Sequence, residues 1–155
     1  MWLEKAEVEK YKKLDSCNNE INCGGHALHV NSWYQIGDDI NWFNDEIRKA
    51  SHTREWRKFE HKCVRYILSD VPELKLINRR LVDNVEVDLE QYEIIAFRIA
   101  RNWLGSFHFM RCESNGDWTE KCGSRTTIYR YPYEDIYDIW GNMDGRIYFF
   151  IRPRR

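Results

Sequence analysis

The sequence predicts an α+β fold, with helices in its first half and a mainly antiparallel sheet in its second half. Between positions 38 and 70, apolar residues recur at three- and four-residue steps, which is the spacing of helices with one buried face. After Pro72 the chain changes to short runs rich in β-branched and aromatic residues. With 155 residues and 43% apolar content, the chain can form one core, so we expect a single domain over residues 1–155.

Helical periodicity marks three segments before Pro72. Residues 2–14 place apolar side chains among Glu and Lys, and the polar run over 15–20 is expected to be a loop that leads to Cys23. Two further helices follow, one after Asp38 and one after a break over 51–53. Their buried faces carry Ile40, Phe43 and Ile47 in one helix and Trp56, Phe59, Cys63 and Ile67 in the other.

The strands are expected after Pro72. Runs of β-favouring residues cover 74–77, 92–99, 106–111, 126–130 and 146–151, with a short helix over 134–140 and the last strand in the middle of the sheet. Asn115-Gly116 is the pair that a type I′ hairpin turn requires, so the chain should fold back along 118–121. We therefore expect about five strands packed against the N-terminal helices.

The composition excludes several classes of function. Lys and Arg number 24 against 25 Asp and Glu, so the formal net charge is −1 and neither nucleic acid nor a membrane surface is an expected partner. No stretch approaches the roughly 20 consecutive apolar residues that span a bilayer, and the charged start is unlike a signal peptide. We therefore expect a cytoplasmic protein.

Cys23 is the candidate nucleophile. The five cysteines form an odd set at irregular spacings, so free thiols are expected. Cys23 lies where a polar loop meets the small and then apolar run 24–28, and the N-terminal end of a helix there would favour the thiolate. Gly24 and Gly25 indicate that another group approaches the backbone closely, and a bound substrate is one candidate. A buried structural cysteine is the alternative that this segment leaves open.

His108 is the candidate base. Alternation along its strand places His108 and Met110 on one face and the flanking Phe107 and Phe109 on the other. A single histidine in a strand is more often a packed side chain than a base. A cysteine nucleophile, however, needs an imidazole within reach of its sulfur, so we pair Cys23 with His108.

A third group usually orients the imidazole, and the hairpin register decides whether Glu120 is that group. In a strict two-residue turn Arg111 faces Glu120, which places Glu120 on the face away from His108. One extra residue in the loop pairs Met110 with Glu120 and brings Glu120 to the face of His108. The alternatives are Asp117, Asn142 and Asp144.

Residues 107–124 resemble a segment of a bacterial and phage group of cysteine peptidases. The shared pattern is Phe-His-x-x-Arg-x4-Gly-x-Trp-x-x-Lys-x-Gly, which begins at Phe107. That group also carries an upstream Asn-Cys-x-x-x-Ala-Leu, matched here by 22–28, and a closing aromatic strand like 147–150. In the order of its elements the chain is similar to the papain-like superfamily, particularly the NlpC-type and CHAP-type amidases.

The resemblance implies a papain-like cysteine hydrolase that acts on a peptide or protein substrate without a cofactor. It implies attack of Cys23 on an amide carbonyl and proton transfer by His108. The oxyanion hole would combine the Cys23 N–H with an upstream donor, and Gly24 would contribute to the oxyanion or substrate site. The upstream candidates are Asn18, Asn19 and Asn22. The group often has His at the position of Glu120, so a carboxylate here either orients the base or marks a degenerate site.

The sequence also allows a metal site, an interaction protein and an anion site. Cys17, Cys23, His26 and His29 lie close in sequence, but their spacing matches no established zinc pattern, so no metal is expected. A non-enzymatic phage or bacterial interaction protein with a degenerate papain-like site is the main alternative, with 33–34 and 42–43 as aromatic anchors. The charged stretch 54–58 is expected to be a solvated helix face rather than an anion site.

Overall fold

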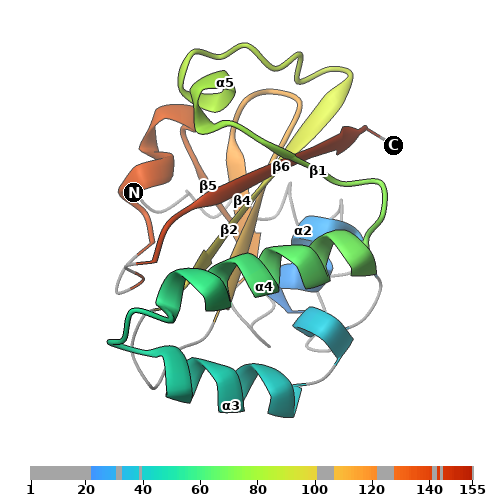
Figure 1. Ribbon diagram of the computed structural model, residues 1–155. Helices are drawn as coiled ribbons and strands as arrows, with labels where there is room; N and C mark the ends of the chain where they lie inside the picture. Colours follow the sequence, from blue (N-terminus) through green and yellow to red (C-terminus); the bar gives the residue numbers. More distant parts are fainter. Residues whose placement is uncertain are drawn as a thin grey trace.

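The computed structural model describes residues 22–30, 33–38, 40–100, 107–121, 128–140, 143 and 145–154. Its centre is a six-stranded antiparallel sheet with the strand order β1-β6-β2-β3-β4-β5 (Figure 1). The strands are β1 (Lys75–Ile77), β2 (Tyr92–Ile99), β3 (Phe107–Cys112), β4 (Trp118–Lys121), β5 (Ile128–Tyr131) and β6 (Tyr148–Pro153). The predicted α+β fold with an antiparallel sheet is confirmed, and the last strand is an interior strand between β1 and β2.

Short and medium helices surround this sheet. They are α2 (Cys23–Leu28), η1 (Ile36–Asp38), α3 (Ile40–Ala50), α4 (Trp56–Asp70), α5 (Arg79–Asp83) and η2 (Tyr133–Tyr137), of which η1 and η2 are 3₁₀ helices. The two predicted amphipathic helices correspond to α3 and α4, and their apolar residues Phe43, Ile47 and Ile67 are at most 2% exposed. Helix α2 begins at Cys23, as expected.

Both faces of the sheet are buried. On one face α3 and α4 lie side by side and pack against Phe97, Phe109 and Phe150 (Figure 1). On the other face Met110 and Phe149 pack with residues of η2 and the segment after it. Successive residues of β2 and β3 point to opposite faces, so both strands contribute to two apolar clusters.

The hairpin between β3 and β4 differs from the predicted type I′ turn. Arg111 pairs with Thr119, so the loop contains three residues, 114–116, rather than two. Within this loop only Gly116 has a positive φ, at 91°, whereas a type I′ turn needs two such residues in a row. The extra residue sets the second of the two predicted registers and brings Glu120 to the face of His108.

The helix predicted over 134–140 differs from the observed structure, and the predictions for residues 2–20 are not tested by it. The helix predicted over 134–140 is instead the 3₁₀ helix η2, whose last turn is closed by a bond from Asp138 N–H to the Asp135 carbonyl at 2.9 Å. The helix over 2–14 and the loop over 15–20 lie outside the described residues. Among the described residues, none of the helices has the length and apolar character that crossing a bilayer requires.

Candidate active site

Asn22 caps the helix that begins at Cys23. Its Oδ1 accepts hydrogen bonds from the backbone N–H groups of Gly25 and Tyr34, both at 2.9 Å, and its Nδ2 donates to the Tyr34 carbonyl at 2.7 Å. Asn22 is 4% exposed, and these three bonds engage both ends of its carboxamide. The structure therefore gives Asn22 a role in placing Cys23, whereas the sequence proposed it as an oxyanion donor.

Gly24 is required by the ring of Tyr34. A Cβ at position 24 would lie 2.7 Å from Tyr34 Cδ2, closer than two non-bonded carbons can approach. The Tyr34 hydroxyl also donates to Asp70 Oδ2 at 2.7 Å, which holds the ring between α2 and the end of α4. The group that approaches the backbone at Gly24, for which a substrate was one candidate, is therefore a side chain of the protein itself.

Two buried arginines hold the C-terminal end of α2. Arg111 of β3 donates from Nη1 to the His26 carbonyl at 2.6 Å, and Arg152 of β6 donates from Nη1 to the Leu28 carbonyl at 2.8 Å. Both arginines are at most 2% exposed. Because the last carbonyls of a helix have no partner within it, these contacts satisfy them and place positive charge at the negative end of the dipole. A helix of six residues is thereby fixed against the sheet.

Glu93 completes the network around this helix end. Its Oε1 accepts from Arg152 Nε at 2.5 Å, and its Oε2 lies 3.1 Å from His29 Nε2. Burial opposes the charge on Glu93, but the hydrogen bond to His29 and the charge of Arg152 outweigh it and lower the pKa of Glu93 to about 2. The carboxylate is therefore charged at any pH at which the protein is expected to work.

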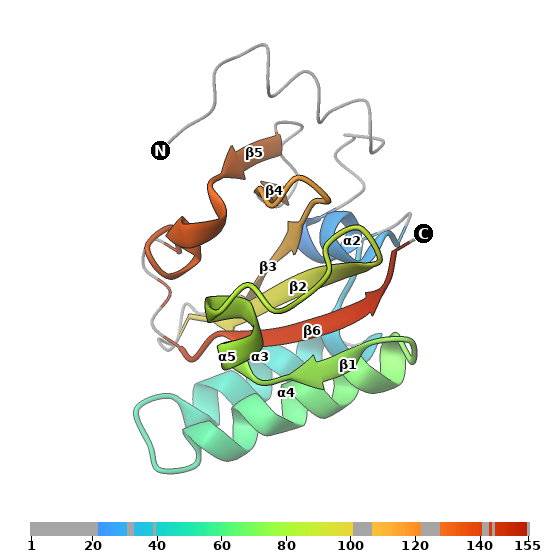
Figure 2. The same cartoon turned by 90° about the horizontal axis from the view of Figure 1, so that it is seen from above.

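His108 lies where β3 and β4 separate. The ladder between the two strands pairs Arg111 with Thr119 close to the hairpin loop, and the described residues record no such pair for His108. Helix α2 packs against both β3 and β4 at this point (Figure 2). The Cys23 sulfur lies 3.9 Å from the Phe107 carbonyl, on the residue next to His108. Cys23 and His108 are therefore brought together by the packing of α2 on β3.

The charge of the His108 imidazole is governed by its two partners. Burial disfavours the charged ring and lowers its pKa, but hydrogen bonding to Cys23 and the negative charge of its sulfur act in the opposite direction. Glu120 adds a second hydrogen bond and a second negative charge. Together they raise the pKa of His108 to about 10. The imidazole is therefore an imidazolium at neutral pH, with a sulfur on one side and a carboxylate on the other.

Glu120 holds the far side of the ring. Its Oε2 lies 2.5 Å from His108 Nε2, and its Oε1 accepts a hydrogen bond from the Tyr131 hydroxyl at 2.6 Å. Burial raises the pKa of Glu120, but the hydrogen bond and the charge of His108 outweigh it, so the net effect is a lowered pKa. Both carboxylate oxygens are thus engaged, and the Cys23, His108, Glu120 and Tyr131 side chains form a chain of polar contacts.

This chain of contacts is largely shielded from water. The side chain of His108 is 13% exposed and that of Glu120 is 6% exposed. The Trp140 ring stands edge-on to the imidazole, with the ring centroids 5.8 Å apart. A shielded imidazolium and carboxylate interact more strongly than the same pair in water.

The other described cysteines occupy different surroundings. Cys63 on α4 and Cys112 on β3 are free thiols with no exposed surface. Burial is the main cause that raises the pKa of both thiols, and nearby carboxylates add to it. Neither is suited to act as a thiolate. Cys17 and Cys122 lie outside the described residues.

The remaining candidate site residues that the structure describes make contacts away from the Cys23–His108 pair. Asp117 forms an ion pair with Arg130 at 3.0 Å, and Glu120 is the candidate among the described residues that contacts His108. Among the zinc candidates, His26 lies 3.0 Å from Thr119 Oγ1, and His29 contacts Glu93. No group of three His, Cys, Asp or Glu side chains suited to a metal occurs in the described part of the chain. Asn18, Asn19, Asn142 and Asp144 fall outside that part.

Two residues of the site, Tyr131 and Arg111, could not be predicted from the sequence. No local pattern in the sequence indicates that the Tyr131 hydroxyl reaches Glu120. Arg111 is part of the resembling segment, but its contact with the His26 carbonyl spans 85 positions and leaves no local signal. The aromatic anchors proposed for an interaction protein are mostly core residues, since Tyr34 and Phe43 are buried and Trp33 alone of those described is strongly exposed.

Comparison of the chain with protein-family models, with curated proteins and with solved structures gave no match. A proposal for its function therefore depends on the geometry of the site and on the chemistry of its residues.

Proposed function

We propose that this protein is a cysteine hydrolase or transferase that acts on an amide bond of a peptide or protein. Cys23 is the nucleophile, His108 is the base and acid, and Glu120 orients the imidazole. The observation that carries the proposal is the position of His108 between a thiol and a buried carboxylate, with its pKa raised to about 10. A thiolate beside an imidazolium is the activated form of a cysteine nucleophile.

In the first half of the reaction, the Cys23 thiolate attacks the amide carbonyl carbon. The carbonyl oxygen becomes a tetrahedral oxyanion, and the new bond joins that carbon to the sulfur. When the intermediate collapses, the carbon–nitrogen bond breaks and the His108 imidazolium gives its proton to the leaving amine. The products of this half are a thioester on Cys23, a free amine and a neutral imidazole.

In the second half, water or another nucleophile attacks the thioester. The neutral His108 imidazole removes a proton from the attacking water, and the carbon–sulfur bond breaks to release a carboxylic acid and the thiolate. Because Nε2 is held by Glu120, we assign these proton transfers to Nδ1 of His108. The orienting bond to Glu120 keeps this tautomer through both halves.

The oxyanion would be stabilised first by the backbone N–H of Cys23. The first N–H groups of a helix have no acceptor within the helix, and this one lies on the nucleophile itself. Since the Asn22 amide is engaged with Tyr34, a second donor would come from further upstream, where Asn19 is the candidate. We also propose that the fold is papain-like. The helix that begins at Cys23 is followed along the chain by an antiparallel sheet, one strand of which carries His108, and this order supports the proposal.

Alkylation of the cysteines tests the proposal. Cys23, Cys63 and Cys112 are all buried, but Cys23 has the His108 imidazole beside it, whereas burial and nearby carboxylates raise the pKa of the other two thiols. Iodoacetamide at pH 7.5, followed by mass spectrometry of the sites, should therefore modify Cys23 at least about tenfold faster than Cys63 or Cys112. Replacement of His108 by Ala should slow alkylation at Cys23 alone. A Cys63→Ala variant serves as the control and should leave the rate at Cys23 unchanged.

Turnover provides the second part of this test. A peptide library incubated with the protein should yield cleaved or transferred products, and Cys23→Ser should yield none while melting at the temperature of the parent protein. Equal and slow alkylation of the three described cysteines would exclude the activated thiol on which the proposal depends.

A further inference from the structure

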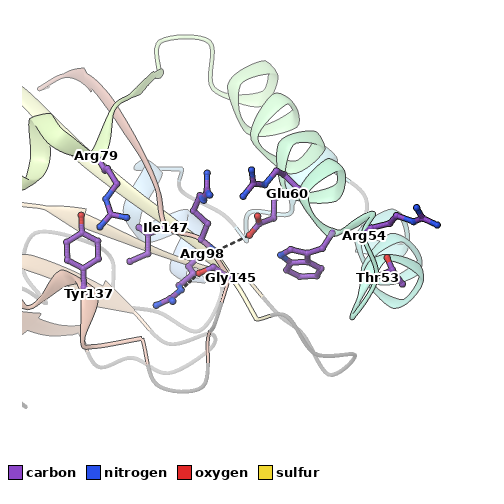
Figure 3. A pocket seen from close by; sticks show the side chains of 11 residues that line it. Thr53, Arg54, Glu60, Arg79, Arg98, Tyr137, Gly145 and Ile147 are labelled. Carbon is purple, nitrogen blue, oxygen red and sulfur yellow. Dashed lines mark hydrogen bonds between the residues drawn. The ribbon is translucent and has the colours of Figure 1, made fainter.

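A basic pocket opens at the end of the sheet, between α4, α5 and the start of β6 (Figure 3). Its volume is about 600 Å³, which is in the range of sites that hold small ligands or a few residues of a peptide. The described residues that line it include five arginines and one carboxylate, a balance of +4 in a chain whose formal net charge is −1. The arginines are Arg54, Arg57, Arg79, Arg98 and Arg146.

The positive charges are distributed along the pocket. Figure 3 shows Arg79 and Tyr137 at one end, Arg54 beyond the other end, and Arg98 with Gly145 between them. Guanidinium groups bind carboxylates through paired hydrogen bonds, and each such pair needs its own acid group. An array of this kind fits several acid groups spaced along a chain better than one compact anion.

Glu60, the carboxylate among the described lining residues, does not neutralise this array by an ion pair. Its Oε2 accepts from the backbone N–H of Arg146 at 3.0 Å, and its Oε1 accepts from the Tyr148 hydroxyl at 3.2 Å. Glu60 is 3% exposed, and no ion pair joins it to an arginine within the part of the chain that the structure describes. Of the five arginines, Arg79 lies 3.6 Å from Asp83 and Arg98 binds the Gly145 carbonyl. The positive field toward a ligand therefore comes mainly from the remaining three, Arg54, Arg57 and Arg146.

The pocket adjoins the candidate active site through Arg98. On neighbouring strands Arg98 pairs directly with His108, and such paired side chains lie on the same face with Cβ atoms about 5 Å apart. The Arg98 Nε donates to the Gly145 carbonyl, which fixes the guanidinium at the floor of the pocket. Cys23, His108 and Glu120 do not themselves line the pocket, so Arg98, one strand away from His108, is the link between the pocket and the candidate active site.

We propose that this pocket binds an acidic stretch of the substrate beside the amide bond that Cys23 attacks. The preferred substrates carry Asp or Glu within a few residues of that bond. Tyr137 and Ile147 offer apolar surface to the methylene groups of such side chains. This inference rests on the proposed function, and it names the substrate class of the same site.

Binding of labelled peptides to the full chain carrying Cys23→Ser tests the inference without any need for turnover. A fluorescein-labelled hexaglutamate peptide should bind saturably in an anisotropy titration at fixed ionic strength, and hexaglutamine should not. The double variant Arg57→Gln/Arg146→Gln should weaken hexaglutamate binding by about tenfold or more. The double variant Arg48→Gln/Arg65→Gln removes the same charge from exposed sites outside the pocket and should change binding by less than about twofold.

Three results would overturn the inference. Hexaglutamate does not bind, both double variants lose binding equally, or inorganic phosphate displaces the peptide at constant ionic strength, which would assign the pocket to phosphate. These results leave the alkylation of Cys23 untouched, so failure of the pocket and failure of the nucleophile are separate observations. If hexaglutamate binds but Cys23 alkylates no faster than Cys63, the proposed function fails, and the role of the pocket in substrate recognition fails with it.

Discussion

Glu120 contacts His108 with one carboxylate oxygen and Tyr131 with the other, so its orientation is fixed from both sides. A carboxylate held in this way can act on the imidazole in two ways. It sets the direction of the ring and stabilises the positive charge that the ring carries. These contacts are the geometry that the proposed orienting role requires.

Replacement of Glu120 by Gln tests this role. The amide keeps the size of the side chain but removes its charge, so the pKa of His108 should fall and alkylation of Cys23 should slow by about 100-fold. Stopped-flow alkylation at pH 7.5 measures the rate. Tyr131→Phe is the matched control, since it removes one bond to the same carboxylate and should slow the reaction far less. An unchanged rate in Glu120→Gln would exclude the orienting role.

At this scale the sequence identified the residue types but not all of their partners. Cys23 and His108 could be predicted because a thiol after a polar loop and a histidine in a strand are visible locally. Glu120 could be named only conditionally, because its face depends on a single residue in the hairpin loop. Tyr131 could not be found, since its contact with Glu120 depends on the pairing of β4 with β5.

Helix α2 is too short to be stable alone, and the sheet supplies what it lacks. It has six residues and contains Gly24 and Gly25, which are poor helix formers. Asn22 caps its start, while Arg111 and Arg152 hold its end from two different strands. The position of the nucleophile therefore depends on buried charged side chains far from Cys23 in the sequence.

Replacement of Arg111 by Met should destabilise the protein by about 3 kcal/mol or more. The change removes a buried charged donor from the His26 carbonyl and the Glu113 carboxylate, which lose their bonds of 2.6 and 2.8 Å to the guanidinium. Urea denaturation measures the free energy of unfolding. Arg130→Met is the control on a nearby strand: its ion pair with Asp117 is partly exposed, so the loss should stay below about 1 kcal/mol. Equal losses in the two variants would contradict the anchoring role of Arg111.

The bounds of some elements could be predicted from local sequence patterns, whereas other elements depend on packing that the sequence does not reveal. The bounds of β2 and β4 agree with the predicted ranges, because a run of β-favouring residues marks β2 and the turn residues Asn115-Gly116 mark the start of β4. Helix α5 was missed because a helix of five residues has no room for a periodic pattern. The predicted helix extended to Trp140, but η2 ends at Tyr137. Trp140 lies beyond its end, where its ring packs against the imidazole of His108.

Across the whole molecule, buried charges connect the sheet with α2. Glu93 on β2 is 1% exposed and contacts Arg152 on β6 and His29 at the end of α2. Such a network is destabilising if one member loses its charge, because the others remain buried and unpaired. The fold should therefore respond to acid through Glu93.

The stability of the protein should fall at low pH in a defined window. The pKa of Glu93 is lowered from 4.5 to about 2, so its contribution is present above pH 4.5 and is lost as pH falls toward 2. The shift corresponds to about 3 kcal/mol. Urea denaturation between pH 7 and pH 2.5 should show this loss, and Glu93→Gln should flatten the pH dependence. A slope as steep in Glu93→Gln as in the parent protein would assign the acid sensitivity elsewhere.

His108 acts in the opposite direction at high pH. Its pKa is raised from 6.5 to about 10, so the contribution of its charge is fully present below pH 6.5 and is lost as pH rises through about 10. Above that pH the ring no longer carries the proton that it gives to the leaving amine in the proposed reaction. The molecule should therefore lose its general acid and part of its stability together in alkali.

Titration of the His108 imidazole by NMR tests the pairing of Cys23 and His108 most directly. In protein labelled with ¹³C and ¹⁵N histidine, the ring should stay protonated through neutral pH and titrate near pH 10, and Cys23→Ala should lower its pKa. His108→Ala identifies the signal by its disappearance. A midpoint near 6.5 that Cys23→Ala leaves unchanged would show that the thiol and the imidazole do not interact, and the proposed hydrolase would lose its foundation.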